Sequence, residues 1–432
     1  MDKNVTELKR NINWVHGVAL TIGAVLGSGV MVLPVLAAQL AGPASLLSWL
    51  FMGLLAIPVV TTIGNLARRW PEAGGIAAYA MKAFGRRMGI TTGWLFLGTV
   101  PIGAPIVALV GAGYLGAYLS FKPFEILLAA ALMLLLGIFF NYLGINLSGK
   151  VQMIVVGIIA LILLLIIFSA LPHVNKNAFT PFVPYGWVSV GVSMTLLFLA
   201  FVGWEMIGHL SEEFRNPDRD IKLSLRISLI IVSLLYLLLA FVVVGTKSFL
   251  EGSNFAAMAT LVLKNWGRPA GAIVAVLAYV VCYGSIHTYL AGFSRLVYAQ
   301  SRQGDFPLFF SKLHTIYQTP HRVLLSLIPV FTIVLGLYYI FNLNLSVLIQ
   351  FTSAIFIMLY IICMASAIKL LKGQGKNQLY AIISLVVCVV VYLFTGWALI
   401  YPFLLGALGW FVGFRQQRDF SELSSKNMPQ GF

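Results

Sequence analysis

The sequence predicts an all-α, polytopic membrane protein. Of its 432 residues, 60% are hydrophobic and only 9% are charged, and the mean hydropathy is +0.95. A soluble chain of this length needs more charge to cover its surface. Apolar runs of about 20 residues recur along the chain, which is the length that a helix needs to cross a bilayer. The strands of a membrane β-barrel would instead be shorter and alternating in polarity.

These apolar runs predict twelve transmembrane helices. Residues 1–13 are polar and the first apolar run is too long for a cleavable signal peptide, so the first run is predicted to be a span. Polar stretches such as "RRWPEAGG" and "EEFRNPDRD" separate the later spans. The predicted spans cover residues 14–40, 43–66, 88–119, 123–142, 149–171, 188–211, 224–246, 268–298, 323–341, 346–369, 378–395 and 397–414.

The basic residues predict the orientation of the chain. With twelve spans, most of the 28 Lys and Arg residues fall on the side that both termini share. Because cytoplasmic loops carry the excess of Lys and Arg, both termini are expected in the cytoplasm, with the chain in the inner (cytoplasmic) membrane. The sequence pI of about 9.8 is therefore a topology signal, and nucleic acid is not an expected partner.

The sequence offers no catalytic or metal-binding pattern. Cys282, Cys363 and Cys388 all lie inside apolar runs, which argues against a disulfide framework or a metal cluster. We find no Walker motif, no GxSxG and no metal-ligand spacing. No enzyme activity, cofactor or metal is predicted.

The first span contains an unusual stretch, "IGAVLGSGVMVLP" from Ile22. Gly27, Ser28 and Gly29 weaken the helix near its middle, where lipid allows no unpaired backbone group. At such a break, the amides of the following half-helix suit a carboxylate, and carbonyls around Val25 suit an ammonium group. The alternative is close helix packing by small residues, since Gly23 and Gly27 have the GxxxG spacing.

The sixth span has a second candidate break, with Gly203 beside Glu205 in "LLFLAFVGWEMIGHL". The two breaks are five spans apart, so two five-helix halves would have opposite orientations in the membrane. Interrupted helices at matching positions of two halves indicate a transporter site. Together the breaks favour ligand binding over packing, although residue-level repetition between the halves is not visible.

Glu205 is the one acidic residue well inside a predicted span. A carboxylate at membrane depth is costly, so it is a candidate either for proton coupling or for a hydrogen-bonding brace of the unwound helix. His209 follows one turn later and could pair with it, and His287 lies in the middle of the eighth span as either a core residue or a ligand contact. Because no second acid lies at this depth, a cationic substrate is not expected. Aromatic residues that could line a side-chain pocket, or simply pack, are Phe96, Phe198, Phe201, Trp204 and Tyr289.

Four motifs in order carry a family resemblance. They are "GAVLGSGVMVLP", "PEAGGIAAYAMKAFG", "FLAFVGWEMIGHLSEEFRNPDRDI" and "FSRLVYAQSRQGDFP". From about residue 14 to 414 the chain resembles the amino acid–polyamine–organocation transporter superfamily, and among its members the bacterial exporters of methionine and branched-chain amino acids.

The resemblance implies a leucine-transporter-type fold, with a 5+5 inverted repeat, helices 1 and 6 broken, and two extra helices. One transmembrane domain would hold repeat one (about 14–171), repeat two (about 188–369), the extra helices (about 378–414) and a flexible cytoplasmic tail (415–432). Many relatives carry a lysine in helix five that stands in for a sodium ion. Here that position aligns with Ile159, so the coupling scheme is open.

The resemblance also implies where a substrate binds. Its carboxylate would lie on Ser28, Gly29 and neighbouring amides, and its amine on the carbonyls of Val25, Leu199 and Val202. Glu205 matches an acidic position linked to proton-dependent gating. The full set of predicted substrate-binding residues is Val25, Gly27, Ser28, Gly29, Val30, Phe198, Leu199, Phe201, Val202, Gly203 and His287.

The predicted function is secondary transport of neutral apolar amino acids such as methionine, leucine, isoleucine and valine. Proton-coupled export by alternating access is preferred, with the lipid bilayer, an amino acid and protons as partners. An uptake permease or exchanger is the alternative within transport, and a non-transporting amino-acid sensor is the alternative outside it.

Overall fold

The described part of the chain is built from helices. The computed structural model describes residues 8–27, 29–250, 269–343, 345–393, 398 and 400–426. Within these ranges the chain forms helices and turns, with one isolated parallel bridge between Ile12 and Phe214 and no strand. The all-α prediction is therefore confirmed for these residues.

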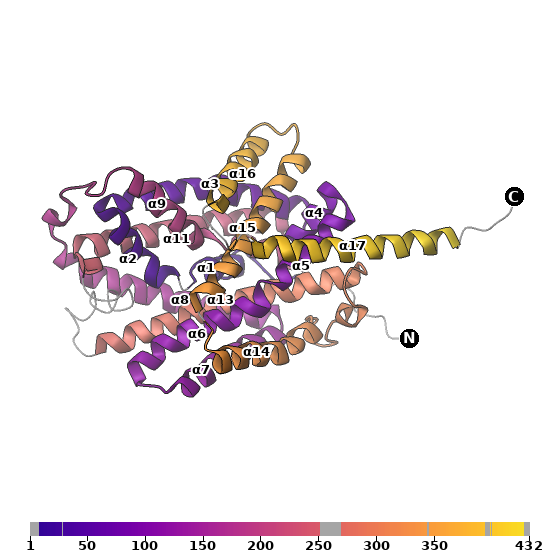
Figure 1. Cartoon of the computed structure of the whole chain (residues 1–432), viewed down its shortest axis with the longest axis horizontal. Coiled ribbons are helices and arrows are strands. Elements are labelled where there is room, and N and C mark those ends of the chain that lie inside the picture. Colours follow the sequence, from indigo (N-terminus) through magenta and orange to yellow (C-terminus); the bar gives the residue numbers. More distant parts are fainter. Residues whose placement is uncertain are drawn as a thin grey trace.

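The long helices run side by side along the long axis of the molecule (Figure 1). The α-helices are α1 (Trp14–Val25), α2 (Gly29–Ala41), α3 (Ser45–Arg69), α4 (Ile76–Phe84), α5 (Arg86–Leu97), α6 (Val100–Leu119), α7 (Pro123–Tyr142), α8 (Ile145–Ala170), α9 (Val188–Leu197), α10 (Met206–His209), α11 (Pro217–Gly245), α13 (Pro269–Arg302), α14 (His321–Phe341), α15 (Leu345–Leu370), α16 (Lys376–Leu393) and α17 (Ile400–Lys426). Short 3-10 turns are η1 (Gly42–Ala44), η2 (Leu171–His173), η3 (Lys176–Phe179), η4 (Phe198–Phe201), η5 (Ser211–Glu213), η6 (Ser248–Leu250) and η7 (Leu308–Ser311).

The helices have the length and composition of membrane spans. Among the described residues, nine helical runs are long and apolar enough to cross a membrane. Three further apolar helices are shorter, namely Trp14–Val25, Val188–Leu197 and Ile400–Gly413, and each lies inside a predicted span. Large apolar side chains such as Phe139 and Ile154 lie exposed on outer faces, as lipid contact requires. The structure supports a multi-pass membrane protein, and the count of twelve spans stays a prediction.

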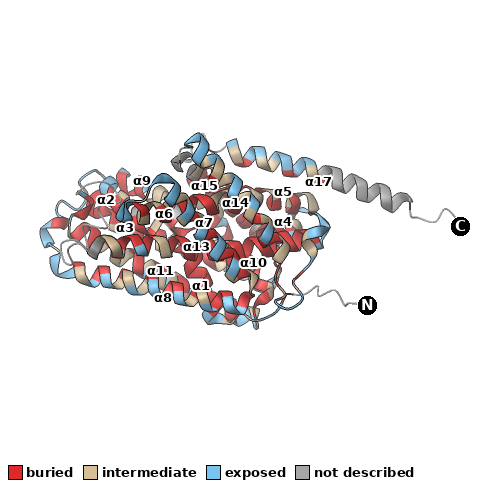
Figure 2. Ribbon diagram, turned by 90° about the horizontal axis from the view of Figure 1, so that it is seen from below, coloured by how far each residue is buried: buried red, intermediate tan, exposed pale blue. Residues whose placement is uncertain are grey.

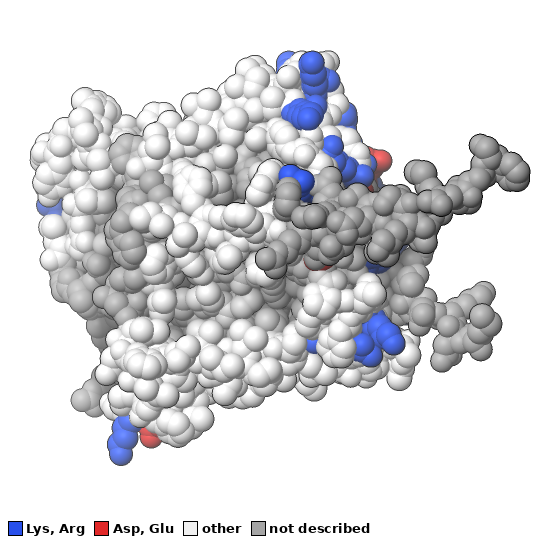
Figure 3. All heavy atoms as spheres, turned by 45° about the vertical axis from the view of Figure 1, so that its right-hand side comes forward, with Lys and Arg blue, Asp and Glu red and all other residues white. Residues whose placement is uncertain are grey.

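Buried residues concentrate at the centre of the bundle, around α13 (Figure 2). This helix of 34 residues packs against α1, α6, α7 and α8. Both interrupted segments contact this centre, since α1 and α10 each pack against α13. The described Lys and Arg residues gather mainly toward one end of the molecule (Figure 3), in keeping with the charge asymmetry of the sequence.

The structure interrupts the predicted third span, 88–119, between α5 and α6. The break falls at Gly98 and Thr99. Pro101 has no amide hydrogen to continue the helix from α5, and a side chain at Gly98 would collide with Leu405, since its Cβ would lie 2.3 Å from the Leu405 Cδ1. Sequence analysis missed this break because the apolar pattern continues across it.

The structure describes a helix in the first part of the predicted tail, 415–432, whose flexibility stays a prediction. Helix α17 continues through the polar residues 415–426 and projects past the end of the bundle (Figure 1). The stretch "RQQRDFSELSSK" contains no Gly or Pro and is rich in residues that tolerate a helix, which explains its continuation. The remaining predicted tail, 427–432, lies outside the described residues.

Candidate functional site

The first predicted break is present in the structure. Helix α1 ends at Val25, Leu26 follows with φ −74° and ψ 68°, and α2 begins at Gly29. Leu26 still donates to the Ile22 carbonyl, whereas the Gly27 amide turns back to the Val25 carbonyl at 2.8 Å. Ser28 lies outside the described residues, so its predicted hydroxyl contact stays a prediction.

The second predicted break is also present. Helix α9 ends at Leu197, a 3-10 turn follows, and the chain then becomes extended at Val202. Gly203 has φ +122°, a conformation that L residues other than glycine rarely adopt. The helix resumes only as the short α10.

The two breaks touch each other through their backbones. A Cβ atom on Gly203 would lie 2.8 Å from the carbonyl carbon and oxygen of Ala24 and 3.0 Å from the Val25 amide nitrogen. No side chain can be added at Gly203 without moving α1. Two segments that are about 180 residues apart in the sequence therefore meet with only backbone between them.

A tyrosine hydroxyl joins the same two segments. The Tyr236 hydroxyl, from α11, lies 3.2 Å from the Val25 carbonyl oxygen and 3.1 Å from the Ala200 carbonyl oxygen. Its single hydrogen is shared between the two acceptors. Tyr236 is fully buried, and its hydroxyl ties the Val25 carbonyl, which also accepts from the Gly27 amide, to the Ala200 carbonyl of the second break.

Glu205 braces the second break. Its Oε2 accepts a hydrogen bond from the Gly203 amide at 3.0 Å and another from the Tyr360 hydroxyl. Its Oε1 accepts from the Tyr289 hydroxyl at 3.1 Å. The carboxyl group is fully buried and surrounded by donors from α13 and α15, which satisfies it at membrane depth. The bracing role is thus visible, and the proton-coupling role stays a prediction.

The glycines of the first break keep an accessible backbone. Gly27 and Gly29 have intermediate exposure, although Val25, Leu26 and Val30 beside them are buried. A Cβ on Gly27 would lie 3.5 Å from the Ser285 hydroxyl of α13, which is ordinary contact. The partly exposed backbone of Gly27 therefore faces the small, hydroxyl-bearing Ser285 of α13.

The predicted aromatic residues surround the breaks, but each already has a packing partner. Phe201 lies against Trp49 and Tyr236, with ring centroids 6.2 and 5.6 Å away. Phe198 packs on Tyr360 at 6.3 Å. The other members, Phe96, Trp204 and Tyr289, pack nearby, and the first two are fully buried. Val202 is buried, and the side chain of Leu199 lies outside the described ones.

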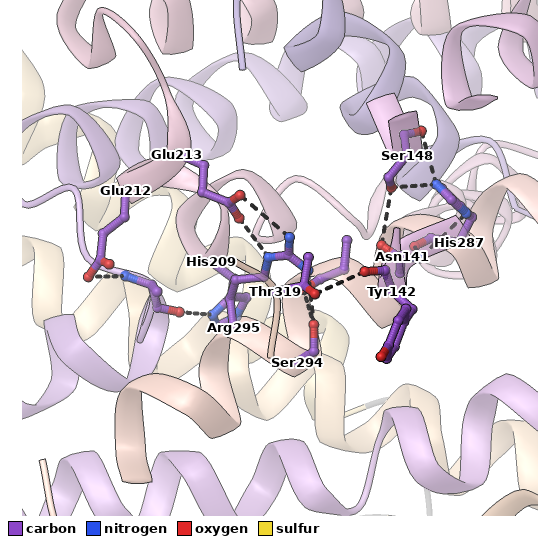
Figure 4. Close-up of polar contacts among 12 residues, drawn as sticks. Asn141, Tyr142, Ser148, His209, Glu212, Glu213, His287, Ser294, Arg295 and Thr319 are labelled. Atoms are coloured by element: carbon purple, nitrogen blue, oxygen red, sulfur yellow. Dashed lines mark hydrogen bonds and ion pairs between the residues drawn. The ribbon is translucent and has the colours of Figure 1, made fainter. Parts of the chain in front are cut away.

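His287 is not brought to the breaks by any contact in the described structure. Its Nε2 lies 2.7 Å from the Ser148 hydroxyl (Figure 4). Its Nδ1 lies 3.3 Å from the Tyr283 hydroxyl. Asn141 donates to the His287 carbonyl and accepts from Ser148. His287 therefore joins α7, α8 and α13 as a satisfied core residue, and its predicted substrate contact gains no support from this geometry.

His209 does not pair with Glu205 in the described contacts. Its Nδ1 faces the Ala73 carbonyl at 3.3 Å, and its ring meets Phe96 edge-on at 4.7 Å. The side chain is fully buried. The i, i+4 pairing that the sequence allowed is not made, since both Glu205 carboxyl oxygens accept from the Gly203 amide, Tyr289 and Tyr360 instead.

Sequence reasoning missed Tyr236, Tyr360 and Gln152. Tyrosines in apolar helices give no pattern that distinguishes a brace from packing, so only the fold pairs them with the breaks. Gln152 is a polar residue inside the fifth predicted span, and this could have marked it. Ile159, the position aligned with the lysine of relatives, is fully buried and apolar.

Ion pairs lie beyond the second break, at the end of the bundle rich in basic residues. Glu213 and Arg295 form a fully buried pair, with Arg295 Nε 2.6 Å from Glu213 Oε1 (Figure 4). Arg302 pairs with Glu212 at 2.8 Å. Arg86 pairs with Asp305 at 2.8 Å, and burial raises the pKa of Asp305 even though Arg86 favours its ionised form.

Comparison with known proteins identifies the family. The model of the amino acid permease family matches residues 12–413. An uncharacterized amino acid permease of Bacillus subtilis is 43% identical over 94% of this chain and 96% of its own length. The L-methionine/branched-chain amino acid exporter of Escherichia coli is 30% identical over 94% of this chain and 96% of its own. A branched-chain amino acid permease of Bacillus subtilis is 27% identical over 73% of this chain and 72% of its own.

These relatives are permeases and transporters rather than enzymes, and the match extends over both breaks and nearly all predicted spans. This match agrees with the superfamily resemblance of the motifs. It also agrees with the accessible glycine backbone at the first break. The chain belongs to the amino acid permease family.

Proposed function

We propose that this protein is a secondary transporter that carries neutral, apolar amino acids across a membrane by alternating access. The observation that carries the proposal is the contact between the two breaks. Gly203 lies against the backbone of Ala24 and Val25, next to the accessible backbone of Gly27 and Gly29. A site built from backbone at the meeting of two broken helices recognises the ends of an amino acid and leaves its side chain free.

The substrate's carboxylate would bind at the start of α2. The amides of Ser28 and Gly29 precede or begin a helix of 13 residues, whose dipole favours an anion at this end, whereas the Gly27 and Val30 amides already donate to the Val25 and Gly27 carbonyls. Amides in the first turn of a helix have no acceptor within the helix.

The substrate's ammonium group would bind the carbonyls of the two preceding segments. Val25 ends α1, and Leu199 and Val202 lie at the second break. The Val25 carbonyl already accepts from the Gly27 amide and the Tyr236 hydroxyl, so the ammonium group would compete with these donors. Such competition offers a way for substrate to loosen the break.

The side-chain preference rests on the surroundings of the site and on relatives. Phe198 and Phe201 flank the second break, and Glu205 is already satisfied by three donors, so little favours a cationic side chain. A relative that matches 94% of this chain is named an exporter of methionine and branched-chain amino acids. Methionine, leucine, isoleucine and valine are therefore the proposed substrates, with export as the proposed direction.

Proton coupling is proposed at Glu205. A proton on this carboxyl would remove its charge and weaken its bond with the Gly203 amide, which would free the second break. Ile159 is fully buried and offers no titratable group at the position where relatives carry a lysine, so the coupling is assigned to Glu205. An uptake permease or an amino-acid exchanger is the alternative within transport.

The membrane arrangement is part of the same proposal. Twelve spans in a 5+5 inverted repeat plus two helices, with both termini cytoplasmic in the cell inner membrane, fit the gathering of basic residues toward one end (Figure 3).

Flux in proteoliposomes tests the function. Labelled methionine or leucine should be released or taken up faster when a pH gradient is imposed than when it is collapsed. Binding without flux would indicate the amino-acid sensor instead. Flux that ignores the pH gradient would remove the proton hypothesis and leave transport intact.

A further inference from the structure

The strongest feature outside the breaks is a point where α1, α8 and α13 converge on one side chain. Gln152, from α8, is fully buried, and its Nε2 donates to the Gly284 carbonyl of α13 at 3.0 Å. A Cβ on Gly23, in α1, would lie 1.6 Å from the same Nε2 and 2.8 Å from the Gln152 Cδ. The amide therefore lies directly against the bare backbone of Gly23.

The surroundings of this amide are apolar. Val155 and Ile159, from α8, face Gly284, and a Cβ on Gly284 would lie 3.0 Å from the Val155 Cγ1 and 3.5 Å from the Ile159 Cδ1. The Gln152 Oε1 is buried and has no hydrogen-bond partner among the described residues. A leucine or methionine would fill this space without burying an unpaired oxygen. The amide therefore carries a cost that its packing alone does not explain.

Helix α8 is tied to α13 at two polar points, one helical turn apart. Ser148 contacts His287, and Gln152 contacts Gly284, so each helix offers both residues from one face. Figure 4 shows the first of these points. Because Gln152 also touches Gly23, α8 and α13 together set the position of α1 at this level.

The position of α1 here determines the geometry of the proposed site. Gly23 lies one turn before Gly27, and Gly284 precedes Ser285, the residue nearest to Gly27. We propose that Gln152 is a positioning residue, whose amide sets the approach of α1 to α13 and so holds the first break in its binding geometry. Gln152 contacts no substrate in this role, and the proposal rests on the proposed transport function.

Substitutions at Gln152 and Gly23 distinguish the effect of the Gln152 hydrogen bond from the effect of the close packing between the two residues. Gln152→Met keeps the volume and removes the bond to Gly284, so leucine affinity should fall about fivefold, the equivalent of one ordinary hydrogen bond. Gly23→Ala should impair binding further because its methyl group collides with the amide. Adding Gln152→Ala to Gly23→Ala should restore part of the binding, since the smaller side chain makes room.

Gly17→Ala provides the matched control. This glycine is also in α1, but a Cβ there would meet Ser224 and Phe214, so Gln152→Ala should not relieve it. A purely structural role would instead lower thermal stability in all variants and leave the affinity of the folded protein unchanged. Unchanged affinity in Gln152→Met, or equal rescue of Gly17→Ala and Gly23→Ala, overturns the proposal.

A measured distance between α1 and α13 tests the role of Gln152 without relying on any particular substrate. Spin labels at the exposed residues Val15 of α1 and Val276 of α13, in a background without the native cysteines, report the spacing of the two helices. The distance distribution should broaden in Gln152→Met and stay narrow in a Tyr279→Phe control. An unchanged distribution contradicts the role of Gln152 even if transport fails for another reason. Absence of leucine and methionine binding in the unaltered protein would count against the proposed function only.

Discussion

At the scale of single residues, Glu205 shows how far sequence reasoning reaches. Its acidic character inside an apolar run identified it as important, and the structure gives the reason, since its carboxyl group accepts bonds from the Gly203 amide and from two tyrosines. The partners Tyr289 and Tyr360 are distant in sequence, so no local pattern pairs them with Glu205.

Glu205→Gln should remove the pH dependence of flux while substrate still binds. Glutamine keeps an acceptor oxygen for the Gly203 amide but cannot gain or lose a proton near neutral pH. Flux should therefore be equal with and without a pH gradient. Glu125→Gln is the control, since this exposed acid lies at the start of α7. A variant that keeps pH-dependent flux would reduce Glu205 to a brace alone.

Tyr236→Phe should weaken substrate binding, because loss of the hydroxyl that ties the Val25 carbonyl to the Ala200 carbonyl loosens the geometry of both breaks, and this outweighs the removal of one competitor for the Val25 carbonyl. One ordinary hydrogen bond predicts a loss of about fivefold in affinity. Tyr279→Phe is the matched control, since its hydroxyl donates to the Ala129 carbonyl at 2.9 Å, away from the breaks. Equal effects of the two substitutions on leucine binding would contradict a specific role for Tyr236.

Gly29→Val should block substrate binding by closing the approach to the α2 amides. The added side chain would also press on Leu33, since even a Cβ on Gly29 would lie 2.9 Å from the Leu33 Cδ1. Gly113→Val is a control, because nothing lies within 4 Å of its Cβ position. Equilibrium binding of labelled leucine measures the difference, and normal affinity in Gly29→Val would refute the placement of the site.

At the scale of elements, the first and second breaks were predictable from the sequence. Gly27 and Gly203 weaken helices that lipid would otherwise favour, and this conflict is visible in the sequence. The interruption between α5 and α6 was not predicted, because Pro101 at the start of a helix looks the same in sequence as a tolerated proline. The helix in 415–426 could not be read from the polar composition that predicts a flexible tail, since helix propensity without Gly or Pro also allows a helix there.

Gly203→Ala should be far more damaging than Gly186→Ala. Both glycines have positive φ, +122° and +77°, but only the Gly203 Cβ would collide with α1. Strain in φ alone costs about 1–2 kcal/mol, so Gly186→Ala should shift the melting temperature slightly and leave binding intact. Gly203→Ala should lower the melting temperature further and abolish leucine binding. Similar melting curves and affinities would contradict contact between the two breaks.

At the scale of the whole molecule, the sequence predicted an all-α membrane protein and most of its span positions. It could not predict which charges meet, because Glu213 and Arg295 come together only when the loop after the second break folds onto α13. The polar network of His287 was hidden for the same reason, since its partners come from α7 and α8.

Arg295→Met should destabilise the protein by about 3–5 kcal/mol, because it leaves the Glu213 carboxylate buried without its partner. The double variant Arg295→Met/Glu213→Gln should be milder, since no charge remains unpaired. Arg68→Met is the control at a pair whose acid, Asp218, is largely exposed, and it should cost less than about 1 kcal/mol. Thermal unfolding in detergent gives the comparison, and equal losses at both pairs would argue against the burial of Glu213.

The Tyr236 hydroxyl has a consequence for motion. It contacts one carbonyl oxygen from each broken segment, and Gly203 packs directly against the α1 backbone. The first and second breaks are therefore expected to move together. Neither helix can tilt far without pulling the other along. A substrate bound at both breaks, as proposed, would therefore be bound or released at its two ends together.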